Sequence, residues 1–282
     1  MPFDQKIRDI YKELPNSERA VADVMLEFPG DIAIYTSGEL AERANSSNSA
    51  VTRLIKRVGY KDYREVQREV REAQIQGVGI YRTTSHMHEA SPKDSFAEHL
   101  SLEMKNLQET FAALSNEDFT QAATATKRAR RVWVIGFRNG FFFASYLRRQ
   151  LIQIRPNVVL LPVGGQSIME DLADATPDDV VIAIGVRRRA PILKEAMRLL
   201  HSMDVPIVYF CDHRAVTTRN YSRWSFSCLS AGTILYDSCT TVLSAIYFFI
   251  AEVYVQSGRP TQDRMALIEA RVDVLNEADN EN

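Results

Sequence analysis

Small polar and basic side chains follow one another from Ser46 to Lys61, and their chemistry suits a polyanion. Hydroxyl and amide groups exchange hydrogen bonds with base edges, while lysine and arginine pair with phosphates. From Arg53 to Arg64 there are five basic residues and one acid, a local net charge of 5 − 1 = +4. Residues 1–76 as a whole carry 12 − 13 = −1, so the positive charge is concentrated in this stretch. The stretch therefore predicts a local nucleic-acid-binding surface.

Two short helices must position these side chains. The pattern SGELAERA predicts a helix that Ser37 caps, and SNSAVTRLIKRV predicts a second helix that ends before Gly59. Two helices joined by a tight polar turn are typical of a helix-turn-helix, whose second helix places its N-terminal residues in the major groove. The apolar positions expected to hold the pair together are Leu40, Ala41, Ala44, Val51, Leu54, Ile55 and Val58.

If these helices form a helix-turn-helix, the polar side chains of the turn and of the second helix are predicted to contact DNA. Those at the helix start would contact bases or phosphates, and Thr52 and Arg53, one turn further on, could still reach the groove. The basic residues beyond them would contact flanking phosphates. The predicted DNA-binding residues are Ser46, Ser47, Asn48, Ser49, Thr52, Arg53, Lys56, Arg57 and Lys61. A plain helical hairpin with a solvated basic face fits the same pattern, because short motifs of this kind have many chance matches.

Helical periodicity extends from Phe3 to about Gln76 and gives way to a different pattern after residue 130. One of the early helices, at residues 16–28, is expected to bury Ala20, Val21, Val24, Met25 and Phe28. Later, five apolar runs alternate with helical patterns, and they cover residues 131–137, 157–163, 179–186, 206–212 and 224–229. Continuous apolar strands alternating with helices predict a parallel sheet covered on both faces.

The predicted architecture is an all-α helix-turn-helix domain followed by an α/β doubly wound parallel-sheet domain. We expect the first to cover residues 1–76 and the second residues 96–282. Between them, residues 77–95 combine glycines, a proline and small polar residues without a sustained period, which is typical of a linker.

Composition narrows the class of protein further. The 282-residue chain has a formal net charge of 34 − 36 = −2, so any basic surface must be local. Three cysteines without CxxC spacing indicate reduced thiols, and neither they nor the histidines predict a metal or cofactor site. The N-terminus lacks the apolar core of a signal peptide, and the apolar run at 241–255 is shorter than the roughly 20 residues of a membrane span. We expect a cytoplasmic protein in which that run is a buried helix.

The segment from Leu14 to Val70 resembles the N-terminal domain of RpiR-type bacterial transcription regulators. The resemblance rests on the helix SERAVADVML, the helix ELAERA, the S-x-S-x-V-x-R start at Ser47–Arg53 and the exit VGYKDYREV. That family couples this domain to a sugar-isomerase (SIS) domain, and the order of elements from about Phe96 to Gly258 matches one.

The resemblance implies a sequence-specific DNA-binding transcriptional regulator, expected to act as a repressor of carbohydrate or related metabolism. Its partners would be a double-stranded DNA operator and a small anionic effector, a sugar phosphate or a sugar acid. A palindromic operator needs two recognition helices, so a homodimer or homotetramer is expected. No membrane partner is expected, and the protein would be bacterial, cytoplasmic and nucleoid-associated.

Loops at the carboxyl ends of the predicted strands are where doubly wound sheets bind ligands. GFRNG follows a strand and precedes a helix, so the N–H groups of Asn139 and Gly140 could be open at the helix start and cradle an anion. An ordinary strand-to-helix turn would also use glycine. SIS domains usually carry Gly-x-Gly-x-Ser here, but this chain has Arg138 for the second glycine and Gly140 for the serine. The predicted effector-binding residues are Gly136, Arg138, Asn139, Gly140, Arg187, Arg188, Thr217, Asp237 and Ser238.

The loop GVRRRA stands where SIS domains typically have a Ser/Thr-rich phosphate loop. Arginine binds phosphate or carboxylate bidentately, so an anionic ligand stays compatible with the change. A solvated loop or a subunit contact would explain the three arginines equally well. Capping of the last long helix would equally explain Asp237 and Ser238.

Two other functions fit parts of the sequence. A SIS-type aldose–ketose isomerase would need a general base, for which Glu170, Asp171 and His213 are the candidates in predicted loops. None of them lies in a pattern typical of catalysis, so no catalytic residue is predicted. A helical adaptor that binds protein would make no DNA contact at all, and substitution of Arg53 and Arg57 would then change no DNA binding.

Overall fold

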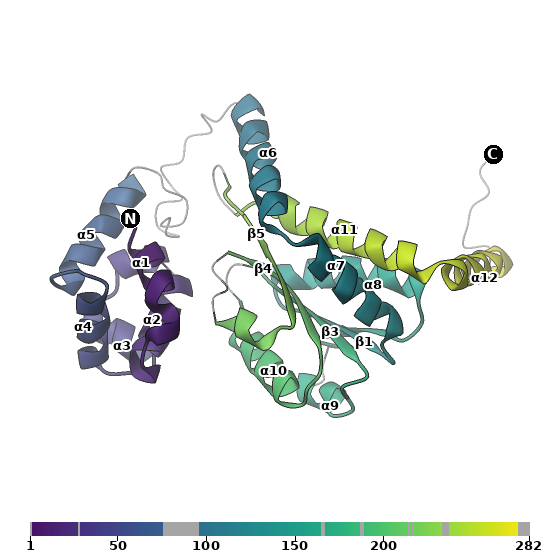
Figure 1. Cartoon of the computed structure of the whole chain (residues 1–282), viewed down its shortest axis with the longest axis horizontal. Coiled ribbons are helices and arrows are strands. Elements are labelled where there is room, and N and C mark those ends of the chain that lie inside the picture. Colours follow the sequence, from purple (N-terminus) through teal and green to yellow (C-terminus); the bar gives the residue numbers. More distant parts are fainter. Residues whose placement is uncertain are drawn as a thin grey trace. The chain divides into compact units, whose positions relative to one another are not determined.

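A computed structural model describes residues 2–27, 29–75, 96–164, 167–186, 189–213, 215, 217–232 and 237–275 (Figure 1). The chain divides into two compact units. The first comprises the chain up to Asn106 together with residues 230–238, and the second comprises residues 107–229 and the chain from Cys239 onward. The predicted linker, residues 77–95, lies outside the described residues.

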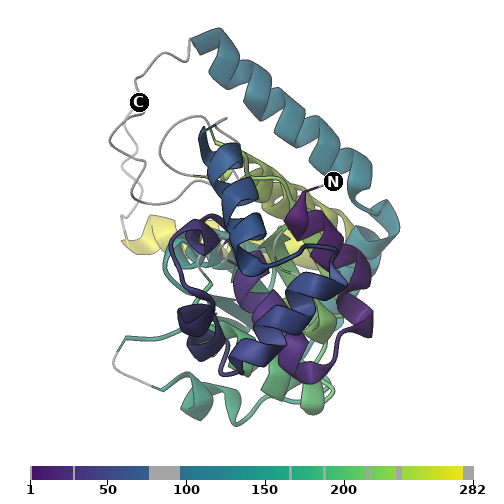
Figure 2. The ribbon, with the colours of Figure 1, turned by 90° about the vertical axis from the view of Figure 1, so that its left-hand side faces the viewer.

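The first unit is helical, as predicted. Its helices are α1 (Phe3–Ile10), α2 (Asn16–Glu27), α3 (Ser37–Arg43), α4 (Asn48–Arg57), α5 (Tyr63–Ile75) and the first part of α6 (Phe96–Ala113), with 3₁₀ turns at Tyr11–Glu13 and Pro29–Ala33. Figure 2 shows α6 along its full length. The core of α1 to α5 contains the fully buried side chains of Phe3, Ile7, Val21, Met25, Leu40, Val51, Leu54, Val66 and Val70.

Two local predictions in this unit were wrong. The cap of α3 is Thr36 and not Ser37: the Thr36 Oγ1 accepts from the Glu39 N–H at 3.2 Å, and the Thr36 N–H donates to Glu39 Oε2 at 2.7 Å. This reciprocal capping box satisfies two backbone donors and starts the helix at Ser37.

The predicted end of α4 before Gly59 is confirmed, because the helix ends at Arg57 and Gly59 has a φ of 87°.

The second error concerns the buried face of α2. Val21, Ala22, Met25 and Leu26 are the fully buried residues, whereas Ala20 and Val24 are only half-buried. Phe28 lies outside the described residues. The face is therefore turned by about one residue from the predicted one, and this rotation brings Glu18 onto the buried side.

The second unit contains a five-stranded parallel sheet, and each predicted apolar run forms one of its strands. The strands are β1 (Val132–Gly136), β2 (Val158–Leu161), β3 (Val180–Gly185), β4 (Ile207–Asp212) and β5 (Trp224–Cys228). Their order is β2-β1-β3-β4-β5, with every neighbouring pair parallel. The order reverses between β1 and β3, which is the topological switch point of the sheet.

Helices cover both faces of the sheet, which confirms the doubly wound prediction. The helices of this unit are α7 (Asn116–Arg128), α8 (Asn139–Ile154), α9 (Ile168–Leu172), α10 (Pro191–Ser202), α11 (Thr240–Ser257) and α12 (Arg259–Leu275), with the end of α6. Alternate strand residues point into two separate cores. Val134, Ile182 and Phe210 pack with α7, α8 and α11, whereas Trp133, Ala183 and Tyr209 pack with α9 and α10.

Helix α11 is the one described helix that is long and apolar enough to cross a membrane. Val242, Ala245, Ile246, Phe249 and Val253 are fully buried in the core shared with the sheet. These contacts agree with the prediction of a core helix. Three side chains of its outer face, Tyr247, Tyr254 and Val255, are exposed.

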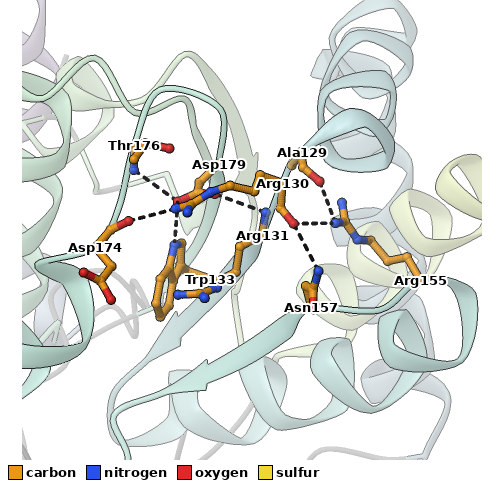
Figure 3. Close-up of polar contacts among 9 residues, drawn as sticks. All are labelled: Ala129, Arg130, Arg131, Trp133, Arg155, Asn157, Asp174, Thr176 and Asp179. Carbon is orange, nitrogen blue, oxygen red and sulfur yellow. Dashed lines mark hydrogen bonds and ion pairs between the residues drawn. The ribbon is translucent and has the colours of Figure 1, made fainter.

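A buried carboxylate ties together the amino ends of β1 and β3 (Figure 3). Asp179, whose side chain is fully buried, accepts two hydrogen bonds from the Arg130 guanidinium, at 2.9 and 2.8 Å. It also accepts from Trp133 Nε1–H at 3.3 Å and from the N–H groups of Arg131 and Thr176, both at 3.1 Å. These bonds make the cluster a structural clamp on the edge of the sheet opposite the carboxyl ends.

A buried arginine closes the same edge. The Arg155 guanidinium donates to the carbonyl oxygens of Thr126, of Ala129 at 2.6 Å and of Pro156 at 3.0 Å. It thereby satisfies carbonyls at the C-terminal end of α7, where an α-helix leaves acceptors unpaired. Burial lowers the pKa of Arg155 from its ordinary value.

Candidate DNA-binding and effector sites

Helix α4 has a buried face and an exposed face. Ala50, Val51, Leu54 and Ile55 are fully buried against the other helices of the unit. The opposite face carries exposed side chains at helical spacing, namely Asn48, Ser49, Thr52, Arg53, Lys56 and Arg57, and Lys61 follows it, also exposed. The structure therefore brings eight of the nine predicted DNA-binding residues, those from Ser47 onward, to one exposed stretch. We call α4 the recognition helix.

The turn before the recognition helix is held by its own polar groups. The Ser46 N–H donates to the Ala41 carbonyl at 2.9 Å, and Asn45 occupies the left-handed region with a φ of 46°. Ser47 is the N-cap, and its Oγ accepts from the Ala50 N–H at 3.2 Å. The half-buried Ser46 donates its hydroxyl proton to the carbonyl of Ser17 at 2.9 Å. Ser46 and Ser47 thus have structural roles that the sequence did not indicate.

Two of the predicted DNA-binding arginines share a buried acid. Glu18, in the first turn of α2, has a side chain that is 2% exposed. Its carboxylate accepts from Arg53 Nε at 3.3 Å and from Arg57 Nε at 2.8 Å and Nη2 at 3.5 Å. The hydrogen bond from Arg57, helped by Arg53, outweighs the effect of burial and holds the pKa of Glu18 below its ordinary value. Sequence reasoning missed this residue.

The candidate effector site lies at the carboxyl ends of β1 and β3, on either side of the switch point. The turn from Gly136 leads into α8, whose first residues are Asn139 and Gly140. Arg138 and Asn139 are exposed there, as an anion-binding turn requires. The N–H of Gly140, which we expected to be open, instead donates to the carbonyl of Phe137 at 2.9 Å.

The two glycines of this turn allow close packing of α8 on the sheet. A Cβ atom on Gly136 would lie 2.6 Å from the carbonyl carbon of Gly140 and 2.8 Å from the Cβ of Ala144. A Cβ on Gly140 would lie 2.6 Å from the carbonyl oxygen of Ile184 in β3. All three distances are too short for any side chain, so packing explains these glycines. For Gly140 this replaces the predicted role as an open backbone donor.

Arg138 keeps the backbone conformation of a glycine. Its φ of 54° and ψ of −126° are rarely adopted by residues with a Cβ. Conformations of this kind cost about 1–3 kcal/mol and occur preferentially at functional sites. Arg138 thus has a backbone conformation that glycine adopts readily, and its side chain is exposed to solvent.

A buried ion pair joins the loop after β3 to the last residue of β4. Arg189, whose side chain is 9% exposed, donates from Nη1 to Oδ2 of the fully buried Asp212 at 2.7 Å. Nearby, the Tyr209 hydroxyl donates to the Gly185 carbonyl at 3.5 Å and accepts from Thr218 at 3.0 Å. Burial raises the pKa of Tyr209, so the hydroxyl stays protonated. The ion pair was not predicted, because it joins residues 23 positions apart on different strand ends.

The other predicted effector residues are distributed as follows. Arg187 and Arg188 lie outside the described residues. Thr217 is half-buried just before a 3₁₀ turn in the second unit. Asp237 and Ser238 belong to the first unit, where the Ser238 hydroxyl donates to Oε2 of Glu103 in α6 at 2.8 Å.

The candidate bases for an isomerase lie on two segments of the second unit. Glu170 forms part of the capping box of α9, where its Oε2 accepts from the Ser167 N–H at 3.3 Å. Asp171 lies on the same short helix, whereas His213 follows β4. Across the part of the chain that the structure describes, no group of three His, Cys, Asp or Glu residues is placed to hold a metal ion.

Comparison with known proteins agrees with both halves of the structure. The family model "Helix-turn-helix domain, rpiR family" matches residues 1–76, and the SIS domain model matches residues 127–252. An uncharacterized HTH-type transcriptional regulator of Thermotoga maritima is 23% identical over 227 residues, which cover 79% of each chain. The regulator YfhH of Escherichia coli is 25% identical over 203 residues, 68% of this chain and 70% of that protein.

Two solved structures share the fold. The sugar isomerase domain of an RpiR transcription factor from Sphaerobacter thermophilus has a TM-score of 0.56 at 20% identity, covering 63% of this chain and 97% of that chain. The NanR protein of Vibrio vulnificus, complexed with ManNAc-6P, has a TM-score of 0.59 at 17% identity and covers 97% and 98%. The chain is thus a helix-turn-helix transcriptional regulator with a SIS domain. It belongs to the RpiR family.

Proposed function

We propose that the recognition helix binds duplex DNA through its exposed face and that a small anionic effector controls this binding from the carboxyl edge of the sheet. The observation that carries the proposal is the division of α4 into a buried apolar face and an exposed polar, basic face. Such a helix can enter a groove without disturbing its own core. The relatives named as HTH-type transcriptional regulators support this role.

The exposed side chains divide by chemistry. Asn48, Ser49 and Thr52 are short donors and acceptors near the helix start, where base edges are read. Lys56 and Lys61 carry charge at the other end and suit phosphates, which position the protein without reading sequence.

Duplexes selected from a random library by the wild-type chain test the DNA-binding proposal. We expect one preferred duplex, with an affinity that falls steeply as salt increases, because phosphate contacts release counterions. Lys56→Gln is expected to weaken binding to all duplexes by a similar factor and to lower the salt slope by about 1. The control Arg68→Gln, an exposed position on α5, should leave both unchanged. Failure of the wild-type chain to enrich any duplex would contradict the proposal.

We propose a sugar phosphate or a sugar acid as the effector. Arg138 is exposed at the start of α8, which follows β1, and Arg189 follows β3, the other strand that borders the switch point of the sheet. The structural neighbour NanR was solved with a sugar phosphate, which supports the ligand class. The serine of the usual SIS turn is replaced by Gly140, so the arginine side chains would supply much of the anion recognition.

A thermal-shift screen tests the effector class with sugar phosphates, sugar acids, the matching neutral sugars and inorganic phosphate. A ligand present at 100 times its Kd is expected to stabilise the protein by about 2.7 kcal/mol. Arg138→Gln should reduce this shift, whereas Arg149→Gln, an exposed position further along α8, should not. Equal shifts from the neutral sugars would contradict an anionic effector.

We also propose that the protein acts as a homo-oligomer, a dimer or tetramer, in the bacterial cytoplasm, associated with the nucleoid. Two recognition helices about 34–36 Å apart are needed to read a palindromic site. Exposed aromatic and aliphatic side chains on α8 and α11, Phe142, Tyr247 and Val255, offer apolar surface for subunit contact. Repression of carbohydrate or related metabolism is the proposed outcome of operator binding.

A further inference from the structure

The shared contact between Glu18 and two arginines places a fixed charge cluster beside the recognition helix. Arg53 and Arg57 are one helical turn apart on α4, and both reach across to the same carboxylate of α2. The acid is 2% exposed, whereas the arginine side chains are 53% and 46% exposed. The cluster therefore has a buried anionic base and a solvent-facing cationic surface.

The geometry leaves hydrogen-bond donors available on the outer side. Arg53 contacts Glu18 through Nε, and Arg57 contacts it through Nε and Nη2. Within the described part of the chain, the remaining terminal nitrogens of these two side chains make no hydrogen bond. Each guanidinium has five N–H donors in a planar fork, so it can bind a carboxylate on one side and a phosphate on the other.

DNA is not expected to displace Glu18. A carboxylate that is withdrawn from water and loses its cationic partners is strongly destabilised. A phosphate that binds the remaining N–H donors of the arginines leaves the Glu18 carboxylate paired, so it causes no such destabilisation. The two arginines should therefore keep their contacts with α2 when the recognition helix meets a duplex.

The position of α2 decides what these arginines can reach. Its first turn also contacts the turn of the helix-turn-helix, where Ser46 donates to the Ser17 carbonyl at 2.9 Å. Because both arginines bind Glu18 of α2, the side chains of Arg53 and Arg57 lie on the side of the recognition helix that faces α2. Contacts along the flank of a groove helix are made with phosphates, and base edges are read from its N-terminal turn.

Building on the proposed DNA-binding function, we propose that Glu18 is a positioning residue that commits Arg53 and Arg57 to the DNA backbone. Base reading is then left to Asn48, Ser49 and Thr52. Because the arginines are fixed, they cannot follow the phosphates of a duplex on which the recognition helix is out of register. Glu18 thereby weakens binding to wrong sequences more than binding to the right one.

The test compares the duplex selected by the wild-type chain with a scrambled duplex of the same composition. Glu18→Gln is expected to tighten binding to the scrambled duplex about fivefold, while binding to the selected duplex changes less than twofold. The matched control is Glu42→Gln, which makes the same charge change at an exposed position of α3. It should shift both affinities by the same factor.

Two further variants separate positioning from folding and from base reading. In an Arg53→Gln/Arg57→Gln background, Glu18→Gln should no longer change the ratio of the two affinities. Arg53→Gln alone should weaken the selected duplex more than the scrambled one and lower the salt slope of the selected duplex by about 1; this measurement does not require Glu18→Gln to fold.

Several results would overturn the inference. The first is that Glu18→Gln leaves the ratio of the affinities for the selected and the scrambled duplex unchanged. The second is that Glu18→Gln still changes this ratio in the Arg53→Gln/Arg57→Gln background. The third is that Arg53→Gln gains a new preference at a single base pair. Each of these leaves the proposed function intact, because the wild-type chain still selects a duplex. If the wild-type chain selects none, the proposed function and this inference fail together.

Discussion

Asp179→Asn is expected to lower the Tm of the α/β unit by about 6–12 °C. The fully buried carboxylate accepts from two backbone N–H groups, the Trp133 indole and the Arg130 guanidinium. An amide keeps one oxygen acceptor and turns an NH₂ group toward these donors. Leaving buried donors without an acceptor costs about 1–3 kcal/mol each, so we expect a loss of about 3 kcal/mol. For a unit of this size, each kcal/mol corresponds to about 2–4 °C.

The neighbouring position provides the control for this prediction. Asp178 is exposed, and Asp178→Asn makes the same chemical change beside the clamp. Surface substitutions of this kind usually stay within about 0.5 kcal/mol. Circular dichroism melts of both variants would measure the difference, and equal Tm values would show that the clamp contributes nothing.

The hydrogen bonds of Asp179 also make the stability of the α/β unit depend on pH. Burial opposes ionisation of Asp179, but the hydrogen bonds from Arg130, Thr176 and Trp133 outweigh it and hold its pKa below the ordinary value. The unfolded value is about 3.9. The stability from this group is therefore complete above that pH and is lost as pH falls through the lower folded pKa. The Tm difference between the wild-type chain and Asp179→Asn should shrink from pH 6 toward pH 3.

Gly136→Ala is expected to destabilise the α/β unit by about 3 kcal/mol and to abolish the thermal shift caused by the effector. The added Cβ would meet the backbone of Gly140 and the Cβ of Ala144, so β1 and α8 would have to separate. Inserting a methyl group into a packed contact typically costs about 1–3 kcal/mol, and here the obstacle is largely backbone, which cannot rotate away. The same separation would displace Arg138 at the candidate effector site.

Gly164→Ala is the matched control, because nothing lies within 4 Å of a Cβ at that position. Gly164 follows β2 on the same edge of the sheet, so the comparison holds the location in the fold constant. Chemical denaturation measures the stability of both variants, and the ligand screen measures the effector response. A Gly136→Ala protein as stable as Gly164→Ala would contradict the packing argument.

Much of the fold could be predicted from the sequence because its signals are local. The five strands are continuous apolar runs, and a strand buried on both faces needs no other feature to be recognised. The recognition helix was equally clear, since Val51, Leu54, Ile55 and Val58 follow helical spacing and Gly59 ends the helix. Such patterns are complete within a dozen residues.

The Glu18 cluster was missed because it joins residues 35 and 39 positions apart. A signal was nevertheless present: Glu18, Val21, Ala22 and Met25 have the spacing i, i+3, i+4, i+7. An acid in such a row occupies a buried position and needs a cationic partner. The error of one residue in the predicted face of α2 concealed this relation.

The candidate effector site at the carboxyl ends of β1 and β3 was harder to predict for a different reason. Glycines at Gly136 and Gly140 indicate either anion binding or close packing, and only the distances to Ala144 and Ile184 distinguish the two. Likewise, three consecutive arginines do not reveal which one pairs with Asp212. Both ambiguities depend on the order of the strands, which the chain sets through contacts distant in sequence.

The two-faced character of the recognition helix has a consequence for the divergence of such proteins. The helix is anchored by its inner residues and by the Ser47 cap, and Asn48, Thr52 and Lys56 contribute no apolar contact to that anchorage. Replacing these outward residues should leave folding nearly unaffected. New target sites can then arise by drift at a few codons while the scaffold is conserved, so closely related paralogues would be expected to control different promoters.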